Sequence, residues 1–216
     1  MAASKFNRLL VEGLTDLVAI AELSEGNGIP WPKGDEPVCI IPLGTKTPKK
    51  SIVENELKAR DVKFLGVVLD ADDDAHLSWE LVKSWFADAF PDLPEQIPEA
   101  GYVSDVNLGG QRLGVWIMPD NRSVGTLETL LKKLVRAESN AVLEHAVKSC
   151  NESKTRGAPF KKVHEEKAHV FTWLAWQDEP GRNLNTVDFA NVFDPKSLHA
   201  QPFIAWLLKL FDIQKP

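Results

Sequence analysis

Four aspartates lie within five residues of one another at the end of an apolar segment of the sequence. VKFLGVVLDADDDAH, residues 62–76, passes from a run of apolar residues into Asp70, Asp72, Asp73 and Asp74. Two like charges about 4 Å apart repel by about 4 kcal/mol at an effective dielectric constant near 20, so carboxylates this close need a compensating cation. Because side chains alternate along a strand, Asp70 and Asp72 can point the same way, and we expect them to act together.

A second acidic strand end lies earlier in the sequence. FNRLLVEG, residues 6–13, predicts a short strand that ends near Glu12, and Asp16 follows one helical turn later. Because ligands collect at the carboxyl ends of parallel strands, we expect both carboxylates to converge with Asp70 and Asp72. Oxygen ligands without His or Cys partners suit Mg²⁺ or Mn²⁺, which neutralise charge that develops in phosphoryl transfer. The pattern therefore predicts a site for one or two such ions.

Asp73 and Asp74 have a simpler interpretation. Acidic residues after a strand often cap the next helix, and we expect these two near its first turn. His76 is the one histidine close to the acidic residues in the sequence, and the five histidines show no metal-ligand spacing. We therefore expect a site built from carboxylates.

Strands and helices alternate in the first part of the chain. The apolar patterns predict strands at residues 6–13, 38–43 and 62–70, and helices at 14–26, 47–61 and 76–90, the last stopped by Pro91. This alternation indicates an α/β fold with a mainly parallel sheet flanked by helices. Residues 101–120 predict a β-hairpin around the turn Leu-Gly-Gly-Gln.

The later part of the chain has a mainly helical pattern. Helices are expected at residues 124–150, with a break near Ser139, and at 166–177 and 201–211, with a polar, basic loop at 151–162. Helical spacing places the aromatic residues of the last two helices in the core, namely Phe171, Trp173, Trp176, Phe203 and Trp206. We expect residues 1–131 to form the α/β core and residues 132–216 to form a helical extension packed on it.

The composition is that of an ordinary globular chain. The 216 residues are 44% hydrophobic and 26% charged, with a net charge of −6, which lacks the basic excess of many nucleic-acid-binding domains. Cys39 and Cys150 show no zinc or disulfide spacing and predict reduced thiols. The first twenty residues predict neither a secretory signal nor a membrane span. We expect a cytoplasmic protein that does not associate with membranes.

Two acidic motifs together resemble a known domain. VEGLTD, residues 11–16, followed by VVLDADDDA, residues 67–75, resembles the Toprim domain of primases, topoisomerases, small RNA-maturation nucleases and the overcoming-lysogenization-defect nucleases. The resemblance implies a Toprim or Rossmann-like sheet. It implies that Glu12 is a general acid/base or metal ligand and that Asp70 and Asp72 hold Mg²⁺.

A third acidic segment extends the resemblance towards the nucleases. MPDNRSVGTLETLL, residues 118–131, matches a later motif in which Asp120 and Glu128 would help to hold a second metal, and Lys167 would complete the catalytic site. The whole chain is similar to small, stand-alone Toprim-like proteins with a helical C-terminal half. It departs from the primase pattern, which has a glycine within the Asp motif, and its size excludes both primases and topoisomerases.

Two basic segments could contact phosphates. GTKTPKK, residues 44–50, carries Lys46, Lys49 and Lys50 without forming a Walker A loop, and is either a phosphate contact or a solvated helix start. SKTRGAPFKKV, residues 153–163, is either a guide for nucleic acid or a flexible surface loop, and its cations are Lys154, Arg156, Lys161 and Lys162.

The leading hypothesis is a Mg²⁺-dependent Toprim-type nuclease that hydrolyses phosphodiesters of nucleic acid. The first alternative is a non-catalytic Toprim-like module that binds a metal or a protein partner in a defence or toxin-like system. The second alternative is a metal-dependent phosphohydrolase that acts on nucleotides or other small phosphates. Cleavage assays with oligonucleotides and with a nucleotide panel distinguish the three.

Overall fold

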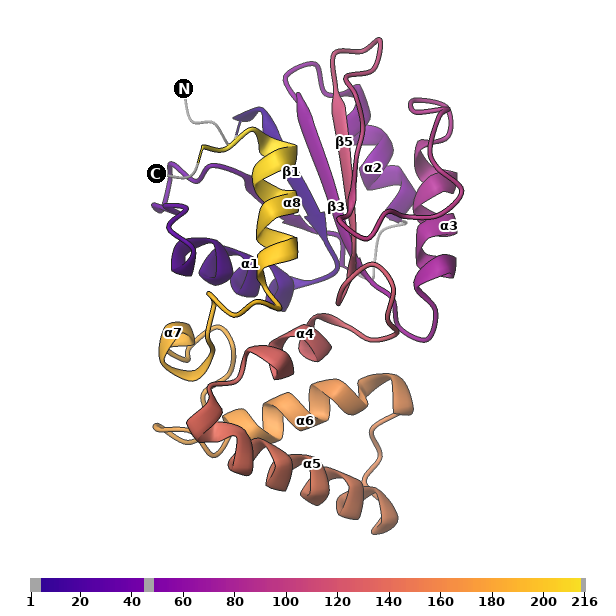
Figure 1. Cartoon of the computed structure of the whole chain (residues 1–216). Helices are drawn as coiled ribbons and strands as arrows, with labels where there is room; N and C mark the ends of the chain where they lie inside the picture. The colour runs from indigo at the N-terminus through magenta and orange to yellow at the C-terminus, as the bar shows by residue number, and fades with distance from the viewer. Residues whose placement is uncertain (1–4, 45–48, 215–216) are drawn as a thin grey trace.

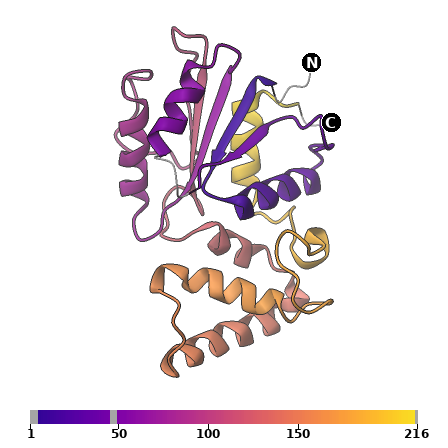
Figure 2. The same ribbon diagram turned by 180° about the vertical axis from the view of Figure 1, so that it is seen from behind.

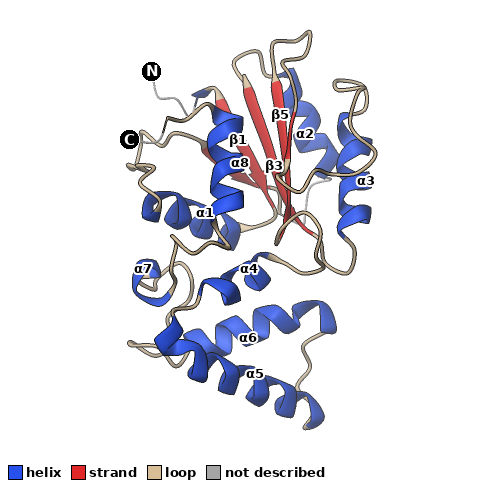
Figure 3. Cartoon of the chain, viewed as in Figure 1, coloured by secondary structure: helices blue, strands red, loops and turns tan. Residues whose placement is uncertain are grey.

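A five-stranded sheet forms the centre of the chain (Figures 1 and 3). The structure is a computed structural model and describes residues 5–44 and 49–214. The strands are β1 (Asn7–Val11), β2 (Cys39–Pro42), β3 (Phe64–Asp70), β4 (Tyr102–Val103) and β5 (Arg112–Met118). Their order is β2-β1-β3-β5-β4, and only β4 runs antiparallel to its neighbour. The predicted α/β class, mainly parallel sheet and β-hairpin are therefore confirmed.

Helices cover both faces of the sheet (Figures 1 and 2). They are α1 (Leu14–Gly26), α2 (Lys49–Lys58), α3 (Ala75–Phe86), α4 (Leu127–Leu134), α5 (Asn140–Thr155), α6 (Glu165–Leu174), α7 (Phe189–Val192) and α8 (Gln201–Phe211). Helices α1 and α8 lie on one face, and α2 and α3 lie on the other. Helices α4 to α7 lie beyond the carboxyl ends of the parallel strands, so they close over the edge where the acidic residues lie.

The two hydrophobic clusters follow from alternation along the strands. On β3, Val67 and Leu69 pack with α2 and α3, whereas Val68 belongs to the cluster that contains α1 and α8. The near-continuous apolar run of β3 is therefore buried on both faces, as parallel strands in α/β folds require. This double burial fixes the position of Asp70 at the end of the strand.

Helix α8 returns to the sheet after the helical segment. Gly66 and Gly114 lie opposite each other in the register of β3 and β5. A Cβ atom on Gly114 would lie 2.5 Å from Cδ2 of Leu210, and one on Gly66 would lie 2.9 Å from the same atom. The two glycines form a notch for Leu210, so residues 201–211 complete one face of the sheet.

Some predicted boundaries were wrong. Helix α3 ends at Phe86, before the predicted stop at Pro91, and α5 extends to Thr155, so residues 151–155 are helical instead of a loop. The predicted break near Ser139 is confirmed, because α4 ends at Leu134 and a 3-10 turn precedes α5. That break has a tertiary cause, since the Leu134 carbonyl accepts a hydrogen bond from the main chain of Asp194.

The predicted burial of aromatic residues in the last two helices is confirmed for three of the five. Trp173, Phe203 and Trp206 are buried, whereas Trp176 is 44% exposed because α6 ends two residues before it. None of the helices within residues 5–44 and 49–214 is both long enough and apolar enough to cross a membrane.

Candidate functional site

Four carboxylates from four elements meet at the carboxyl edge of the sheet. Glu12 follows β1 directly, Asp16 lies in the first turn of α1, and Asp70 is the last residue of β3. Glu128 lies in the first turn of α4 and is only 5% exposed. Glu12, Asp16 and Glu128 are each close enough to Asp70 to raise its pKa. The structure thus brings together the acids of three separate sequence motifs.

Asp70 is the centre of this group. Burial, reinforced by the three neighbouring carboxylates, raises the pKa of Asp70 to about 8. Its Oδ1 accepts a hydrogen bond of 2.9 Å from the main-chain N–H of Leu127, at the start of α4. The partial positive charge of a helix N-terminus favours a carboxylate there. This single contact does not offset the burial and the repulsion, so Asp70 holds its proton near neutral pH.

Asp16 is the second perturbed acid. Burial raises its pKa to about 6, with further increases from Glu128 and Glu12. Its Oδ2 accepts a hydrogen bond of 3.1 Å from the N–H of Gly13, so the side chain also caps the start of α1. Asp16 therefore has a structural role as well as a place in the acidic group.

Two lysines provide the positive charge at this edge. Nζ of Lys49 lies 3.0 Å from Oε1 of Glu12. Nζ of Lys167, from α6, lies 3.8 Å from Oε1 of Glu128, whose other oxygen accepts a hydrogen bond from Thr126. The resemblance alone predicts a role for Lys167, and the fold brings it to Glu128, which lies 39 residues earlier in the chain.

Asp72 lies beside the group on its solvent side. The alternation argument for it was wrong, because β3 ends at Asp70 and Asp72 has a left-handed φ of 50°. Its main chain instead forms two hydrogen bonds with Gly125, of 2.9 and 2.8 Å. Partial burial and the charge of Glu12 raise the pKa of its exposed side chain. Asp72 therefore reaches the site by a turn.

Asp73 and Asp74 differ from the buried acids. Oδ1 of Asp74 accepts a hydrogen bond of 2.8 Å from the N–H of His76, which caps α3 as the sequence suggested. Asp73, which lies between Asp72 and Asp74 in the sequence, is exposed.

Asp120 is not part of the acidic group. Its oxygens accept hydrogen bonds from the N–H groups of Arg122 and Ser123 and from the Ser123 hydroxyl, and Lys133 lies 3.5 Å away. Burial alone would raise the pKa of Asp120, but these contacts hold it below the ordinary value. Asp120 closes a turn after β5, and the expectation that it joins Glu128 has no support in the geometry.

Only part of the predicted basic surface faces the site. Lys50 and Lys161 are exposed, whereas Lys46 lies outside the described residues. Lys154 donates to the carbonyls of Ala158 and Phe160, and Arg156 pairs with Glu152, so these two cations close the end of α5. Lys162, in contrast, lines a cleft together with Asp72.

A partly buried charged network, which the sequence reasoning missed, holds α6 against α4. Nζ of Lys132 lies 3.0 Å from Oε2 of Glu166 and 3.5 Å from Nδ1 of His169. Burial and the charge of Lys132 lower the pKa of His169, which is 4% exposed. Lys132 lies one helical turn after Glu128 in α4. This spacing was the sequence signal that could have linked Lys132 to the acidic group. The network positions α6 so that Lys167 reaches Glu128.

The donor atoms suit a hard divalent cation. Every acidic ligand candidate supplies carboxylate oxygens, as Mg²⁺ and Mn²⁺ prefer. No three His, Cys, Asp or Glu side chains within the described ranges form a ready-made metal-binding group. Lys49 pairs with Glu12, Lys167 pairs with Glu128, and the main-chain N–H of Leu127 donates to Asp70. A cation would have to displace Lys49 or Lys167 from its partner.

The fold and the site define an α/β protein whose parallel sheet carries buried carboxylates at its carboxyl edge. The chain belongs to the family described as Protein of unknown function (DUF3226), whose family model it matches over residues 6–212. The match covers the sheet, the helical segment and α8. No curated protein and no solved structure matches the chain.

Proposed function

We propose that this protein is a Toprim-type nuclease that hydrolyses phosphodiesters of nucleic acid with Mg²⁺ or Mn²⁺. The observation that carries the proposal is the convergence of Glu12, Asp16 and Glu128 on the buried Asp70, whose pKa they help to raise. Without a cation, the neighbouring carboxylates oppose the ionisation of Asp70. The arrangement therefore adds nothing to the stability of the folded state near neutral pH. A divalent cation turns the same arrangement into a binding site.

The carboxylates have distinct roles in this proposal. Glu12, Asp70 and Glu128 hold one or two cations, with Asp72 reaching the same ions from the solvent side. A cation held by these residues would lower the pKa of a water molecule and stabilise the leaving oxygen of the phosphodiester. Glu12 would also take or return a proton, since its side chain is 33% exposed and in contact with solvent.

The two lysines change partners when substrate binds. Lys49 and Lys167 release Glu12 and Glu128 to the cation and pair with oxygens of the substrate phosphate. Lys167 suits this exchange because its side chain is 54% exposed while that of Glu128 is 7% exposed. Its 3.8 Å contact is also longer than a hydrogen bond.

The decisive experiment compares Asp70→Asn and Glu12→Gln with the wild type on labelled DNA and RNA in Mg²⁺ or Mn²⁺. Both substitutions are expected to abolish cleavage while the far-ultraviolet circular dichroism spectrum stays unchanged. Asp120→Asn is the matched control, because this acid lies outside the group, and it should keep activity. Cleavage that persists in both site variants would contradict the mechanism.

One observation favours a second candidate, a non-catalytic module that binds a protein partner. Lys49 and Lys167 already compensate two of the carboxylates, Glu12 and Glu128. If the protein is such a non-catalytic module, it cleaves neither DNA nor RNA, and its binding to the protein partner survives Asp70→Asn. The same set of variants therefore distinguishes the two candidates.

A further inference from the structure

A cleft at the end of the sheet opposite the acidic group has a volume of about 750 Å³. We call it the hairpin cleft, because most of its lining comes from residues between 102 and 111 of the β4–β5 hairpin, with residues 88–92 and Leu57 completing it. The hairpin loop leads into the amino end of β5, whereas Asp70 lies at the carboxyl end of the neighbouring β3 (Figure 1). The length of β3, about 20 Å for its seven residues, therefore separates the hairpin cleft from the candidate site.

Apolar side chains in the hairpin cleft are open to solvent. In the hairpin loop, Leu108 is fully exposed and Val106 is 56% exposed. Leu57 and Tyr102 line the same cleft and are half-buried, so they add apolar surface beside the loop. Single exposed apolar residues are common on protein surfaces, but several that line one cleft are typical of a surface that a partner covers. The hairpin cleft is therefore a candidate docking surface.

The charged side chains of the hairpin cleft are all negative. Asp88, Asp92 and Asp105 line it and are exposed, and the described lining residues include no Lys, Arg or His. Within residues 5–44 and 49–214, none of these three aspartates forms an ion pair. Burial raises the pKa of Tyr102, and the charges of Asp105 and Asp92 raise it further, so carboxylates from two separate loops lie near one ring.

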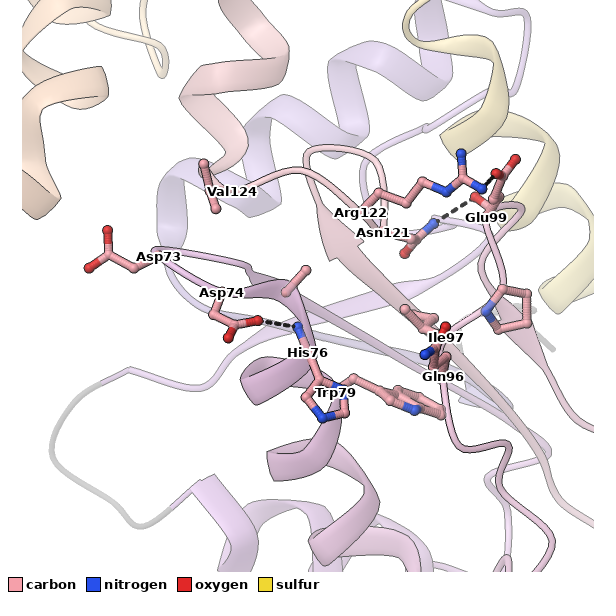
Figure 4. Close-up of a pocket in the computed structure, with 12 residues that line it drawn as sticks. Asp73, Asp74, His76, Trp79, Gln96, Ile97, Glu99, Asn121, Arg122 and Val124 are labelled. Atoms are coloured by element: carbon pink, nitrogen blue, oxygen red, sulfur yellow. Dashed lines mark hydrogen bonds and ion pairs between the residues drawn. The ribbon is translucent and has the colours of Figure 1, made fainter.

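The cleft beside the start of α3 differs from the hairpin cleft in how its charges are compensated. There Arg122 pairs with Glu99, and the carboxylate of Asp74 accepts a hydrogen bond from the N–H of His76 (Figure 4). Two acidic groups of that cleft are thus satisfied within the chain. The aspartates of the hairpin cleft have no such partner among the described residues, so their charge is left for another molecule to compensate.

We propose that the hairpin cleft docks a basic segment of a partner protein, in which lysine or arginine flanks a large apolar side chain. The apolar side chain packs against Val106 and Leu108, and the basic side chains pair with Asp88, Asp92 and Asp105. Charge complementarity favours this occupant, because opposite charges steer partners together whereas like charges repel an acidic segment or a nucleic acid. The inference does not rest on the proposed nuclease function, since a partner docked here leaves the acidic group open.

Short random peptides displayed on phage test the chemistry of the occupant. The library is selected against the full-length protein, and the selected sequences are compared with the unselected library. We expect enrichment of peptides in which Lys or Arg stands beside a large apolar residue. Selected peptides without this pattern, or a selection that yields no binders, would overturn the proposal.

Matched charge variants locate the bound peptide. Fluorescence anisotropy gives the affinity of one selected peptide, synthesised with a fluorescent label. Asp92→Asn combined with Asp105→Asn should weaken its binding about tenfold by removing two ion pairs, and added salt should weaken binding to the wild type. Asp35→Asn combined with Glu144→Gln is the control, because it removes the same charge at exposed positions outside the cleft, and it should keep the wild-type affinity.

A second pair of variants tests the apolar contact. Leu108→Ser should also weaken the peptide about tenfold, because it removes the most exposed apolar side chain of the cleft. Leu198→Ser is the control, since Leu198 is 86% exposed and lies outside the cleft, and it should leave the affinity unchanged. Both leucines are on the surface, so neither substitution is expected to disturb the fold.

The outcomes separate this inference from its alternatives. Peptide binding that the cleft variants leave unchanged, or that the control variants weaken equally, would overturn it. Analytical ultracentrifugation of the protein alone tests a second copy as the occupant, and self-association lost in the Asp92→Asn, Asp105→Asn variant would overturn docking of a foreign partner. Peptide binding that survives Asp70→Asn supports the hairpin cleft whether or not the wild type cleaves nucleic acid, so either proposal can fail alone.

Discussion

The main-chain N–H of Leu127 donates a hydrogen bond of 2.9 Å to Oδ1 of Asp70, which lies 57 residues earlier in the chain. This contact joins the end of the central strand β3 to the start of α4, where Glu128 follows directly. It brings the carboxylates of Asp70 and Glu128 together, although they are too far apart in the sequence to belong to one local motif.

Asp70→Asn should stabilise the protein when no divalent cation is present. The asparagine keeps an oxygen that accepts from Leu127 and removes a charge that burial and three carboxylates oppose. We expect an increase of about 1–3 kcal/mol in the free energy of unfolding at pH 8, measured by urea denaturation with EDTA present. Asp105→Asn, at an exposed position, is the control and should change it by less than about 0.5 kcal/mol. A destabilised Asp70→Asn variant would argue against a repulsive site.

The stability of the wild type should fall as pH rises. The folded-state pKa values of Asp70, about 8, and Asp16, about 6, are raised above their ordinary value of 3.8, so the folded state binds protons that the unfolded state has lost. Their stabilising contribution is complete below about pH 4 and is lost progressively up to about pH 8. Urea midpoints across this range should show the decline, which Asp70→Asn should reduce. A profile unchanged by Asp70→Asn would refute this assignment.

Mg²⁺ or Mn²⁺ should raise the unfolding temperature of the wild type. A ligand at one hundred times its dissociation constant stabilises the folded state by about 2.7 kcal/mol. Differential scanning fluorimetry should show this increase at pH 7.5, and Asp70→Asn and Glu12→Gln should reduce or remove it. Asp120→Asn should respond like the wild type, and an equal response of all four proteins would place the bound ion elsewhere.

Gly114→Ala tests the position of α8. The added methyl group would collide with Leu210, so we expect a loss of about 1–3 kcal/mol in the free energy of unfolding. Leu210→Ala combined with Gly114→Ala should cost less than the sum of the two single changes, because the smaller side chain removes the collision. Additive losses in this double-mutant cycle would show that the two residues do not touch.

Local patterns predicted much of the fold, and their failures have physical causes. The alternation of apolar segments was sufficient for the parallel sheet, because strands buried on both faces leave a clear signal. The end of α4 was harder to predict from the sequence, because a hydrogen bond from the distant Asp194 fixes it. The return of α8 depends on the notch at Gly66 and Gly114, which is a property of the assembled sheet.

The candidate site was predictable only in outline. Strand ends pointed to Glu12 and Asp70, because the carboxyl edge of a parallel sheet is a shared location. Asp72 was assigned by strand alternation, which the left-handed turn at that residue interrupts. The charged network of Lys132, Glu166 and His169 joins two helices whose packing the sequence does not reveal.

The central claim is that the carboxylates at the sheet edge bind a divalent cation. Crystals of the wild-type protein soaked in Mn²⁺ test it most directly, by anomalous diffraction. The account predicts an anomalous peak coordinated by Asp70 and by at least one of Glu12 and Glu128, with Lys49 or Lys167 moved away from its carboxylate partner. Mn²⁺ peaks confined to other parts of the molecule, with both lysine pairs intact, would contradict it.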